Sequence, residues 1–288
     1  MRATYGLILI IITGIFLSSP AYAIKIGLLD DVNKTAVAVS SAGAVFDSRT
    51  GREVYKLEPM KRYPLKVHRN KIAINIEGKY YTLGTDNVTI RTQEPRGFVF
   101  VKGRWYRQNL IISKKFDGLT VINDIDLELY LLGVVPAEMP SGWNFEAHKA
   151  QAIAARSYAV ANLGKRAARG YDLKDTPEDQ AYGGANSETK RTNNAVIETQ
   201  GQVLVCNNKV ISAYYHASSG GQTKNSGKVW NQNLPYLKSV SGFDMGVPKK
   251  GHGVGMSQYG ANNLANNGYN AYQILAHYYT NVTLAQIN

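Results

Sequence analysis

The chain has 288 residues and a formal net charge of +12, from 33 lysines and arginines against 21 aspartates and glutamates. A chain of this length can form one large domain or two small ones with a real hydrophobic core. Its single cysteine, Cys206, excludes an internal disulfide, so the fold is not a small scaffold held by cross-links.

The first 23 residues, MRATYGLILIIITGIFLSSPAYA, have the pattern of a secretory signal peptide. A basic residue, Arg2, precedes an apolar run, and the segment ends in an A-x-A cleavage motif at Ala21 to Ala23. The apolar run is shorter than the roughly 20 residues that a membrane span needs. We therefore expect cleavage near Ala23 and a protein that is secreted, periplasmic or associated with the cell wall; the alternative is a retained anchor.

Export limits the anionic partners that this positively charged protein can meet. A basic protein outside the cytoplasm meets anionic cell-wall polymers or lipids, and we expect no nucleic-acid partner. The clearest basic cluster, KRYPLKVHRNK at residues 61–71, is either a solvated strand edge or a wall-binding face.

Residues 24–104 form the predicted N-terminal β-rich region. Apolar and polar residues alternate in KIAINIEGKYYTLG and in FVFVKGRWYR, on either side of the turn pairs Glu77-Gly78 and Lys102-Gly103. A third hairpin is predicted in NLIISKKFDGLTVIND around Asp117-Gly118. No helical period of useful length precedes residue 125.

An alanine-rich helix is predicted in the middle of the chain, over residues 144–163. A strand, DIDLELYLLGVV, and a turn, EMPSGW, are expected ahead of it, which puts Glu138 in the turn. Six alanines between Ala147 and Ala159 favour a helix, with Asn144 as its N-cap. Because small side chains let other backbones approach closely, we expect this helix to be buried at the centre of a strand-rich α+β fold.

The C-terminal third adds a hairpin, two loops and two helices. The hairpin lies in GQVLVCNNKVIS around Asn207-Asn208, and a Ser/Gly loop with His216 follows it. The glycine loop of KKGHGVGMSQYGANNLANNG, with His252, precedes a short helix, and AYQILAHYYT is predicted as the last helix.

Glu138 stands out because its sequence neighbours are apolar. If it is buried, loss of solvation raises its pKa and lets it act as a general acid near neutral pH. The alternative is an ordinary surface acid paired with a lysine or arginine. His216 and His252 lie in small-residue loops, where they either reach a ligand or serve as core and capping residues.

Several common kinds of site are excluded by missing motifs. The chain has no H-E-x-x-H or C-x-x-C, so we expect no metal site. GHGVG lacks the Gly-Lys-Ser/Thr ending of a phosphate loop, and no nucleotide or other cofactor is expected. G-x-S-x-G is absent, which argues against a serine nucleophile.

The segment YLLGVVPAEMPSGWNFEAHKAQAIAARSYA closely resembles the signature of the stage II sporulation protein D (SpoIID) family, which includes the amidase enhancer LytB. Further matching blocks follow in the family's order: DQAYGG, TQGQVLV, ISAYYHASSGGQT, VWNQNLPYLKSV, GHGVGMSQYGANNLANNG and QILAHYYT. The resemblance covers roughly residues 105 to 285, and residues 105–288 are predicted to be a SpoIID/LytB-like catalytic domain. The segment between Asp244 and Gly251 is shorter than is usual in the family.

The resemblance implies a lytic transglycosylase that cleaves peptidoglycan glycan strands between N-acetylmuramic acid and N-acetylglucosamine, leaving 1,6-anhydro ends. It makes Glu138 the catalytic acid. It also implies substrate contacts for the residues of the matching motifs: Arg156, Tyr215, His216, Ser218, Ser219, His252, Ser257 and Gln258. A lytic transglycosylase needs one carboxylate, whereas ordinary glycosidases use two, and no partner for Glu138 is evident in these motifs.

Two other functions stay open. LytB-type relatives imply a non-catalytic peptidoglycan-binding modulator, whose protein partner would be a cell-wall amidase or autolysin. An exported polysaccharide hydrolase would need a second acid, such as Asp179 or Asp244. The lytic transglycosylase and the modulator would both serve cell-wall remodelling, and the resemblance does not by itself imply sporulation.

Overall fold

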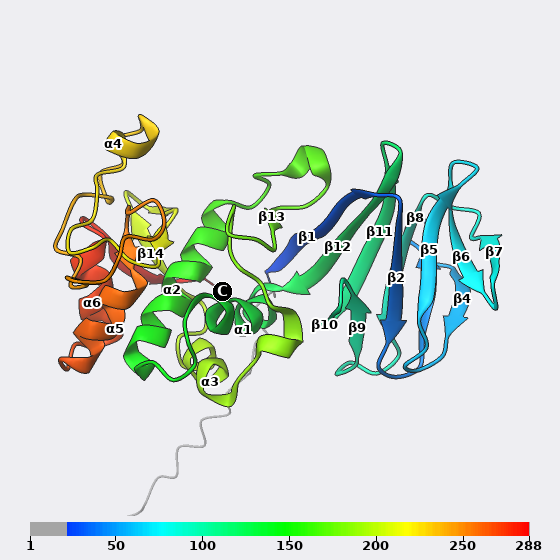
Figure 1. Cartoon of the computed structure of the whole chain (residues 1–288), viewed down its shortest axis with the longest axis horizontal. Coiled ribbons are helices and arrows are strands. Elements are labelled where there is room, and N and C mark those ends of the chain that lie inside the picture. Colours follow the sequence, from blue (N-terminus) through cyan, green and yellow to red (C-terminus); the bar gives the residue numbers. More distant parts are fainter. Residues whose placement is uncertain (1–21, 288) are drawn as a thin grey trace, which may run out of the picture.

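The computed structural model describes residues 22–287 (Figure 1). The predicted signal peptide lies outside the described residues, except for Tyr22 and Ala23. The molecule is elongated, with the N-terminal strands at one end, helices in the middle and the C-terminal helices at the other end (Figure 1). Strand content exceeds helix content, so the predicted strand-rich α+β class is confirmed.

Two sheets form the N-terminal end. The larger has the order β13-β1-β12-β11-β8-β3-β4. Its strands are β1 (Ala23–Val32), β3 (Gly43–Asp47), β4 (Glu53–Leu57), β8 (Asn87–Thr92), β11 (Asn109–Lys115), β12 (Gly118–Asp126) and β13 (Leu173–Lys174). The second has the order β10-β9-β2-β5-β6-β7. Its strands are β2 (Lys34–Val39), β5 (Tyr63–His68), β6 (Lys71–Ile76), β7 (Lys79–Thr82), β9 (Phe98–Val101) and β10 (Arg104–Arg107).

The predicted hairpins are confirmed, with one turn displaced. Glu77-Gly78 joins β6 to β7, and Lys102-Gly103 joins β9 to β10; all four residues have positive φ. In the third hairpin the turn is Phe116-Asp117, because Gly118 already pairs with Lys115 as the first residue of β12. Gly118 is needed there for another reason: a Cβ at this position would lie 2.6 Å from the backbone of Asp31.

The predicted boundary at residue 104 does not separate two units of the structure. It falls inside the β9–β10 hairpin. Moreover, β1 pairs along its length with β12, from Ala23 opposite Asp126 to Val32 opposite Leu119. The start of the described chain is therefore joined directly to a strand inside the region that resembles SpoIID.

The strand predicted to continue through residues 127–135 is wrong. β12 ends at Asp126, whose carboxylate caps helix α1 (Leu127–Glu138) by accepting hydrogen bonds from the amides of Glu128 and Leu129. A short, almost wholly apolar run has no period that distinguishes a buried helix from a buried strand. As a consequence, Glu138 is the last residue of α1 and not part of a turn.

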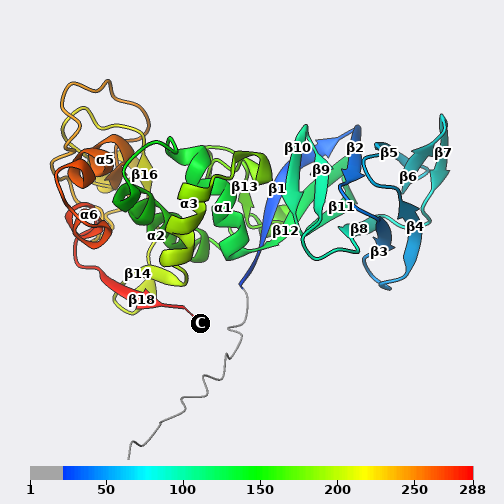
Figure 2. The same ribbon diagram turned by 90° about the horizontal axis from the view of Figure 1, so that it is seen from below.

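The alanine-rich helix is confirmed as α2 (Phe145–Ala161), capped by Asn144. Figure 2 shows α1, α2 and α3 (Lys190–Glu198) between the sheets and helices α5 (Gln258–Asn266) and α6 (Ala271–Tyr278). α2 has two apolar faces: Ala152 and Ala155 pack into one core cluster, and Ala150 and Ala154 into the other. Alanine suits this position because larger side chains would keep the two cores apart.

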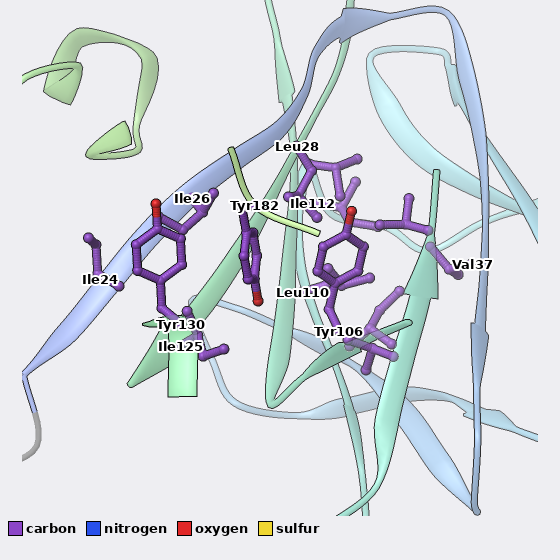
Figure 3. Close-up of a cluster of buried hydrophobic side chains, with 14 of the residues drawn as sticks. Ile24, Ile26, Leu28, Val37, Tyr106, Leu110, Ile112, Ile125, Tyr130 and Tyr182 are labelled. Carbon is purple, nitrogen blue, oxygen red and sulfur yellow. The ribbon is translucent and has the colours of Figure 1, made fainter. Parts of the chain in front are cut away.

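The first core cluster joins the sheets to the helices (Figure 3). Tyr130 of α1 and Tyr182 lie with their ring centroids 4.8 Å apart, and Tyr182 and Tyr106 of β10 with theirs 5.6 Å apart. The Tyr182 hydroxyl donates to Asn123 of β12. This line of tyrosines fixes the position of α1, and hence of Glu138, relative to the larger sheet.

The C-terminal region contains the predicted hairpin and both predicted helices. β14 (Gln202–Cys206) turns through Asn207-Asn208 into β15 (Lys209–Val210), and Cys206 is a free, buried strand residue. The sequence reasoning missed β18 (Thr283–Gln286), which pairs with β14 after α6. Over residues 22–287, no helix combines the length and the apolar character needed to span a bilayer.

Candidate functional site

A cleft of about 760 Å³ opens at the C-terminal end of α1. Its side chains come from α1, α2, the segment after β13, and the loops around β16 (Tyr215–His216), α4 (Gly227–Trp230) and β17 (Met256–Ser257). The polar and aromatic lining residues are Glu138, Tyr158, Lys165, Glu178, Asp179, Tyr214, Tyr215, His216, Trp230, Gln232, Lys250, His252 and Gln258. β16 and β17 pair in parallel, which brings the two predicted loops together.

Glu138 is half-buried in this cleft and is held by three donors. The Ala181 amide lies 2.7 Å and the Tyr215 hydroxyl 3.3 Å from Oε1, while Gln258 Nε2 lies 3.1 Å from Oε2. Among residues 22–287 no lysine or arginine forms an ion pair with it. The predicted alternative of a surface acid paired with a cation is therefore wrong.

Burial raises the pKa of the Glu138 carboxyl above its usual range, because the charged form loses solvation. The hydrogen bonds from Ala181, Gln258 and Tyr215 act in the opposite direction and limit the rise, since they stabilise the carboxylate. The two effects leave a carboxyl group that can hold a proton at higher pH than a solvated glutamate and still release it.

Aromatic side chains form one wall of the cleft. The Trp230 ring centroid lies 4.5 Å from that of Tyr214 and 5.0 Å from that of His252. Tyr214 also contacts Tyr158, with the ring centroids 5.4 Å apart. We refer to Tyr158, Tyr214, Trp230 and His252 as the aromatic wall. Flat apolar faces with polar edges suit the alternating apolar and hydroxyl surfaces of a sugar ring.

The two loop histidines lie side by side, with ring centroids 5.6 Å apart. His216 Nδ1 is 3.1 Å from the Val254 carbonyl, so this nitrogen carries the proton and Nε2 is an acceptor. Nε2 is buried without a partner among the described residues. Burial lowers the pKa of both imidazoles, that of His252 to about 4, so both are neutral at pH 7.

Two further carboxylates line the cleft, and both are engaged. Asp179 has a fully buried side chain that accepts from Lys165 Nζ at 2.7 Å and Arg166 Nε at 2.6 Å. Burial alone would raise its pKa, but these hydrogen bonds outweigh burial and lower it. Glu178 is exposed, and hydrogen bonds from Lys174 to both of its oxygens hold its pKa low. Both groups are therefore ionised and weakly basic.

Asp244 is not a cleft residue, but it binds two of the serines of the predicted site. Its buried carboxylate accepts from the Ser219 hydroxyl at 2.7 Å, from the Ser257 hydroxyl at 2.6 Å and from the Gly221 amide at 2.6 Å. Ser218 donates to the Pro248 carbonyl. The predicted substrate contacts of Ser218, Ser219 and Ser257 are wrong, because these hydroxyls are buried and used to tie the two loops together.

Arg156 is also absent from the cleft. Its side chain has no exposed surface, and it forms a bidentate ion pair with Glu128 of α1. Its Nη1 also donates to the Gln202 carbonyl of β14 at 3.1 Å. The predicted glycan contact of Arg156 is therefore wrong: the guanidinium joins α1, α2 and β14.

The structure brings some of the predicted site residues together in one cleft and places the others outside it. Glu138, Tyr215, His216, His252 and Gln258 line one cleft. The sequence reasoning missed Tyr158, Tyr214, Trp230 and Lys250, and it missed Gln180, which contacts Tyr215. For all of these except Lys250, the signal was their position inside the matching blocks, DQAYGG and VWNQ among them. In the described residues no three His, Cys, Asp or Glu side chains are grouped closely enough to hold a metal ion.

Comparisons with known proteins find a matching family and several relatives. Residues 115–206, which include α1 and α2, match the family described as SpoIID, stage II sporulation protein. The chain is 44% identical over 107 residues to the amidase enhancer of Bacillus subtilis (strain 168), covering 37% of this chain and 14% of that protein.

Two stage II sporulation D proteins are also similar. That of Bacillus subtilis (strain 168) is 39% identical over 144 residues, covering 44% of this chain and 42% of that protein. That of Bacillus amyloliquefaciens is 28% identical over 260 residues, covering 57% of this chain and 76% of that protein. The matches therefore span less than half the length of either Bacillus subtilis relative. The family match over residues 115–206 and these relatives support the likeness to the SpoIID/LytB family that the motifs around Glu138 predicted.

Proposed function

We propose that this chain is a lytic transglycosylase that cleaves peptidoglycan glycan strands outside the cytoplasm, during cell-wall remodelling. The observation that carries the proposal is Glu138: a half-buried carboxyl group with a raised pKa, three neutral donors and no paired cation in the described residues, facing a cleft large enough for sugars. This environment suits a group that must hold a proton and then give it up.

In the proposed reaction, Glu138 acts as acid and then as base. It donates its proton to the glycosidic oxygen as the bond from C1 of N-acetylmuramic acid to that oxygen breaks. The C6 hydroxyl of the same sugar attacks C1, and the Glu138 carboxylate takes the hydroxyl proton. The products are a 1,6-anhydro end and a free N-acetylglucosamine hydroxyl, and no water is consumed.

The cleft supplies groups that could orient the glycan. The aromatic wall offers stacking surfaces, and His216 Nε2 offers a buried acceptor for a sugar hydroxyl or acetamido N–H. Lys250 lies at the edge of the same cleft. Holding the C6 hydroxyl close to C1 makes the displacement intramolecular, which removes much of the entropic cost of bringing a nucleophile to the bond.

The state of the other carboxylates favours this route over hydrolysis. A hydrolase needs a second carboxylate as base or nucleophile. The Asp179 side chain has no exposed surface and is held by two cations, Lys165 and Arg166. Glu178 accepts two hydrogen bonds from Lys174. Neither is free to attack a sugar or activate water.

A second candidate function rests on the amidase enhancer relative. In this case the cleft would bind glycan without cutting it, and the chain would act on a cell-wall amidase or autolysin. The retention of Glu138 in a low-polarity setting argues for the enzyme, because a binding cleft gains nothing from a carboxyl group with a raised pKa.

Mass spectrometry of purified glycan strands after incubation with the protein separates the candidates. Anhydro ends support the transglycosylase, and ends that have gained a water indicate a hydrolase. Intact strands, together with stimulation of a cell-wall amidase in a mixed assay, would favour the modulator. Glu138→Gln is the matched control, because it keeps the side-chain shape and removes the transferable proton.

A further inference from the structure

A chain of buried hydrogen bonds connects Glu138 to the middle of α2. Gln180 has no exposed surface, and its Nε2 lies 3.2 Å from the Ala155 carbonyl and 2.9 Å from the Tyr215 hydroxyl. The Tyr130 hydroxyl donates to Gln180 Oε1 at 3.3 Å. Tyr215 in turn donates to Glu138 Oε1.

The direction of every bond in this chain follows from one backbone group. A carbonyl oxygen can only accept, so the Gln180 atom facing Ala155 must be the NH₂ group. That same NH₂ group supplies a second N–H to Tyr215, whose oxygen therefore accepts. The one proton of the Tyr215 hydroxyl is then left for Glu138 Oε1. Burial raises the pKa of Tyr215 well above its usual value, so this proton stays in place throughout the working pH range.

The same reasoning determines where Glu138 carries its own proton. A carboxylate oxygen has two lone-pair sites. Both sites of Oε1 are filled, by the Ala181 amide and the Tyr215 hydroxyl. Oε2 accepts one hydrogen bond, from Gln258, and keeps one site free.

We propose that Gln180 is a positioning residue: by fixing the direction of the Tyr215 hydroxyl, it confines the transferable proton of Glu138 to Oε2. Without Gln180 the Tyr215 hydroxyl can turn and accept, and the proton can then sit on Oε1, pointing at Tyr215 instead of at the substrate. This inference deepens the proposed function and rests on it for its catalytic meaning, but the hydrogen-bond geometry can be tested without any substrate.

The direct test is the titration of the Glu138 carboxyl group, followed by ¹³C NMR in the full-length protein without glycan. Gln180→Met keeps the length of the side chain and removes the amide. Its Glu138 midpoint should rise by about one pH unit, the value of one neutral hydrogen bond, because the protonated carboxyl can then donate from Oε1 to Tyr215. Tyr215→Phe should give a similar rise. The double variant should rise no further than Tyr215→Phe alone, because Gln180 acts through Tyr215.

Gln151→Met is the matched control. Gln151 is a fully buried glutamine of α2 whose side chain has no hydrogen-bond partner in the described residues, and its replacement should leave the Glu138 midpoint unchanged. The other titratable groups lining the cleft, Lys165, Glu178, Asp179, His216, Lys250 and His252, are the same in all variants. If Gln180→Met does not fold, Gln180→Asn, whose shorter amide cannot reach Tyr215, takes its place.

Two results would overturn the inference: an unchanged midpoint in the folded Gln180 variant, or a rise in the double variant equal to the sum of the single ones. Turnover gives a second reading. If the wild type cleaves glycan, Gln180→Met should lower kcat about 10-fold with KM nearly unchanged, since the amide does not face the cleft. A wild type that cleaves nothing would refute the proposed function and leave the titration result standing.

Discussion

Arg156 and Glu128 form a bidentate ion pair in which Nε–Oε1 and Nη2–Oε2 are both 2.7 Å, and the arginine side chain is completely buried. The Gly201 amide donates to the same Glu128 oxygen that accepts from Arg156 Nε. One pair thus joins α1, α2 and the start of β14. The arginine that family resemblance assigned to the glycan is part of the frame that holds the helix carrying Glu138.

Removal of Arg156 should therefore unfold the protein more easily. Arg156→Ala leaves Glu128 without its cation and α2 with a cavity, and we expect a loss of about 3–5 kcal/mol in the free energy of unfolding, measured with urea. Arg49→Ala, which breaks an exposed pair with Asp86, should change it by less than about 0.5 kcal/mol. Unchanged stability of Arg156→Ala, combined with weaker glycan binding, would indicate that Arg156 contacts the glycan.

Glu138→Gln should fold normally and bind glycan, while turnover falls by about 10²-fold or more, the usual contribution of a positioned acid. The matched variant is Glu178→Gln, the exposed carboxylate of the same cleft. It should retain most of the activity if a single carboxylate is sufficient. A comparable loss in both variants, with hydrated ends from the wild type, would indicate a two-carboxylate hydrolase.

The aromatic wall should contribute to glycan affinity. Trp230→Ala removes the ring that contacts both Tyr214 and His252, and we expect the Kd for a muramic acid-containing oligosaccharide to rise about 10-fold, or about 1.4 kcal/mol. Tyr272→Ala, an exposed tyrosine of α6 outside the cleft, is the control and should bind as the wild type does. Isothermal calorimetry with both variants measures these affinities. Equal glycan affinities of the two variants would show that the aromatic wall does not bind the glycan.

The buried alanines of α2 should tolerate no enlargement. Ala154 and Ala155 have no exposed surface and lie against different cores. Replacing either by leucine should cost about 1–3 kcal/mol in the free energy of unfolding, because the added methyl groups have no space. Ala161→Leu, at the exposed C-terminal end of the same helix, is the control. Equal thermal midpoints for all three variants would contradict the packing.

The two cleft histidines should make stability depend on acid pH. Burial keeps both neutral in the folded protein, and the pKa of His252 is about 4, against about 6.5 for an unfolded histidine. Between these values the unfolded chain binds more protons than the folded one, so stability is complete above pH 6.5 and is lost as the pH falls toward 4. His252→Gln should make urea midpoints less dependent on pH in this window; an unchanged slope would show that His252 is solvated.

Much of the local structure follows from short stretches of sequence. Glu77-Gly78, Lys102-Gly103 and Asn207-Asn208 adopt the positive φ values that a two-residue hairpin needs, and asparagine and glycine adopt them readily. The alanines of α2 and the cap at Asn144 act through neighbours a few residues away. For these elements, the interactions that decide the structure lie within the pattern itself, and so the sequence predicts them.

The run from Leu127 to Val135 shows where local information ends. Apart from Glu128 its residues are apolar on every side, and its helical state depends on the Asp126 cap and on burial against the tyrosines of other elements. The role of Arg156 likewise depends on Glu128, 28 positions away, and that of Tyr215 on Gln180, 35 positions away. Sequence determined that this chain carries a lone acid in an apolar setting; only the tertiary structure decided which groups surround it, because hydrogen bonds and ion pairs form between side chains that folding brings together.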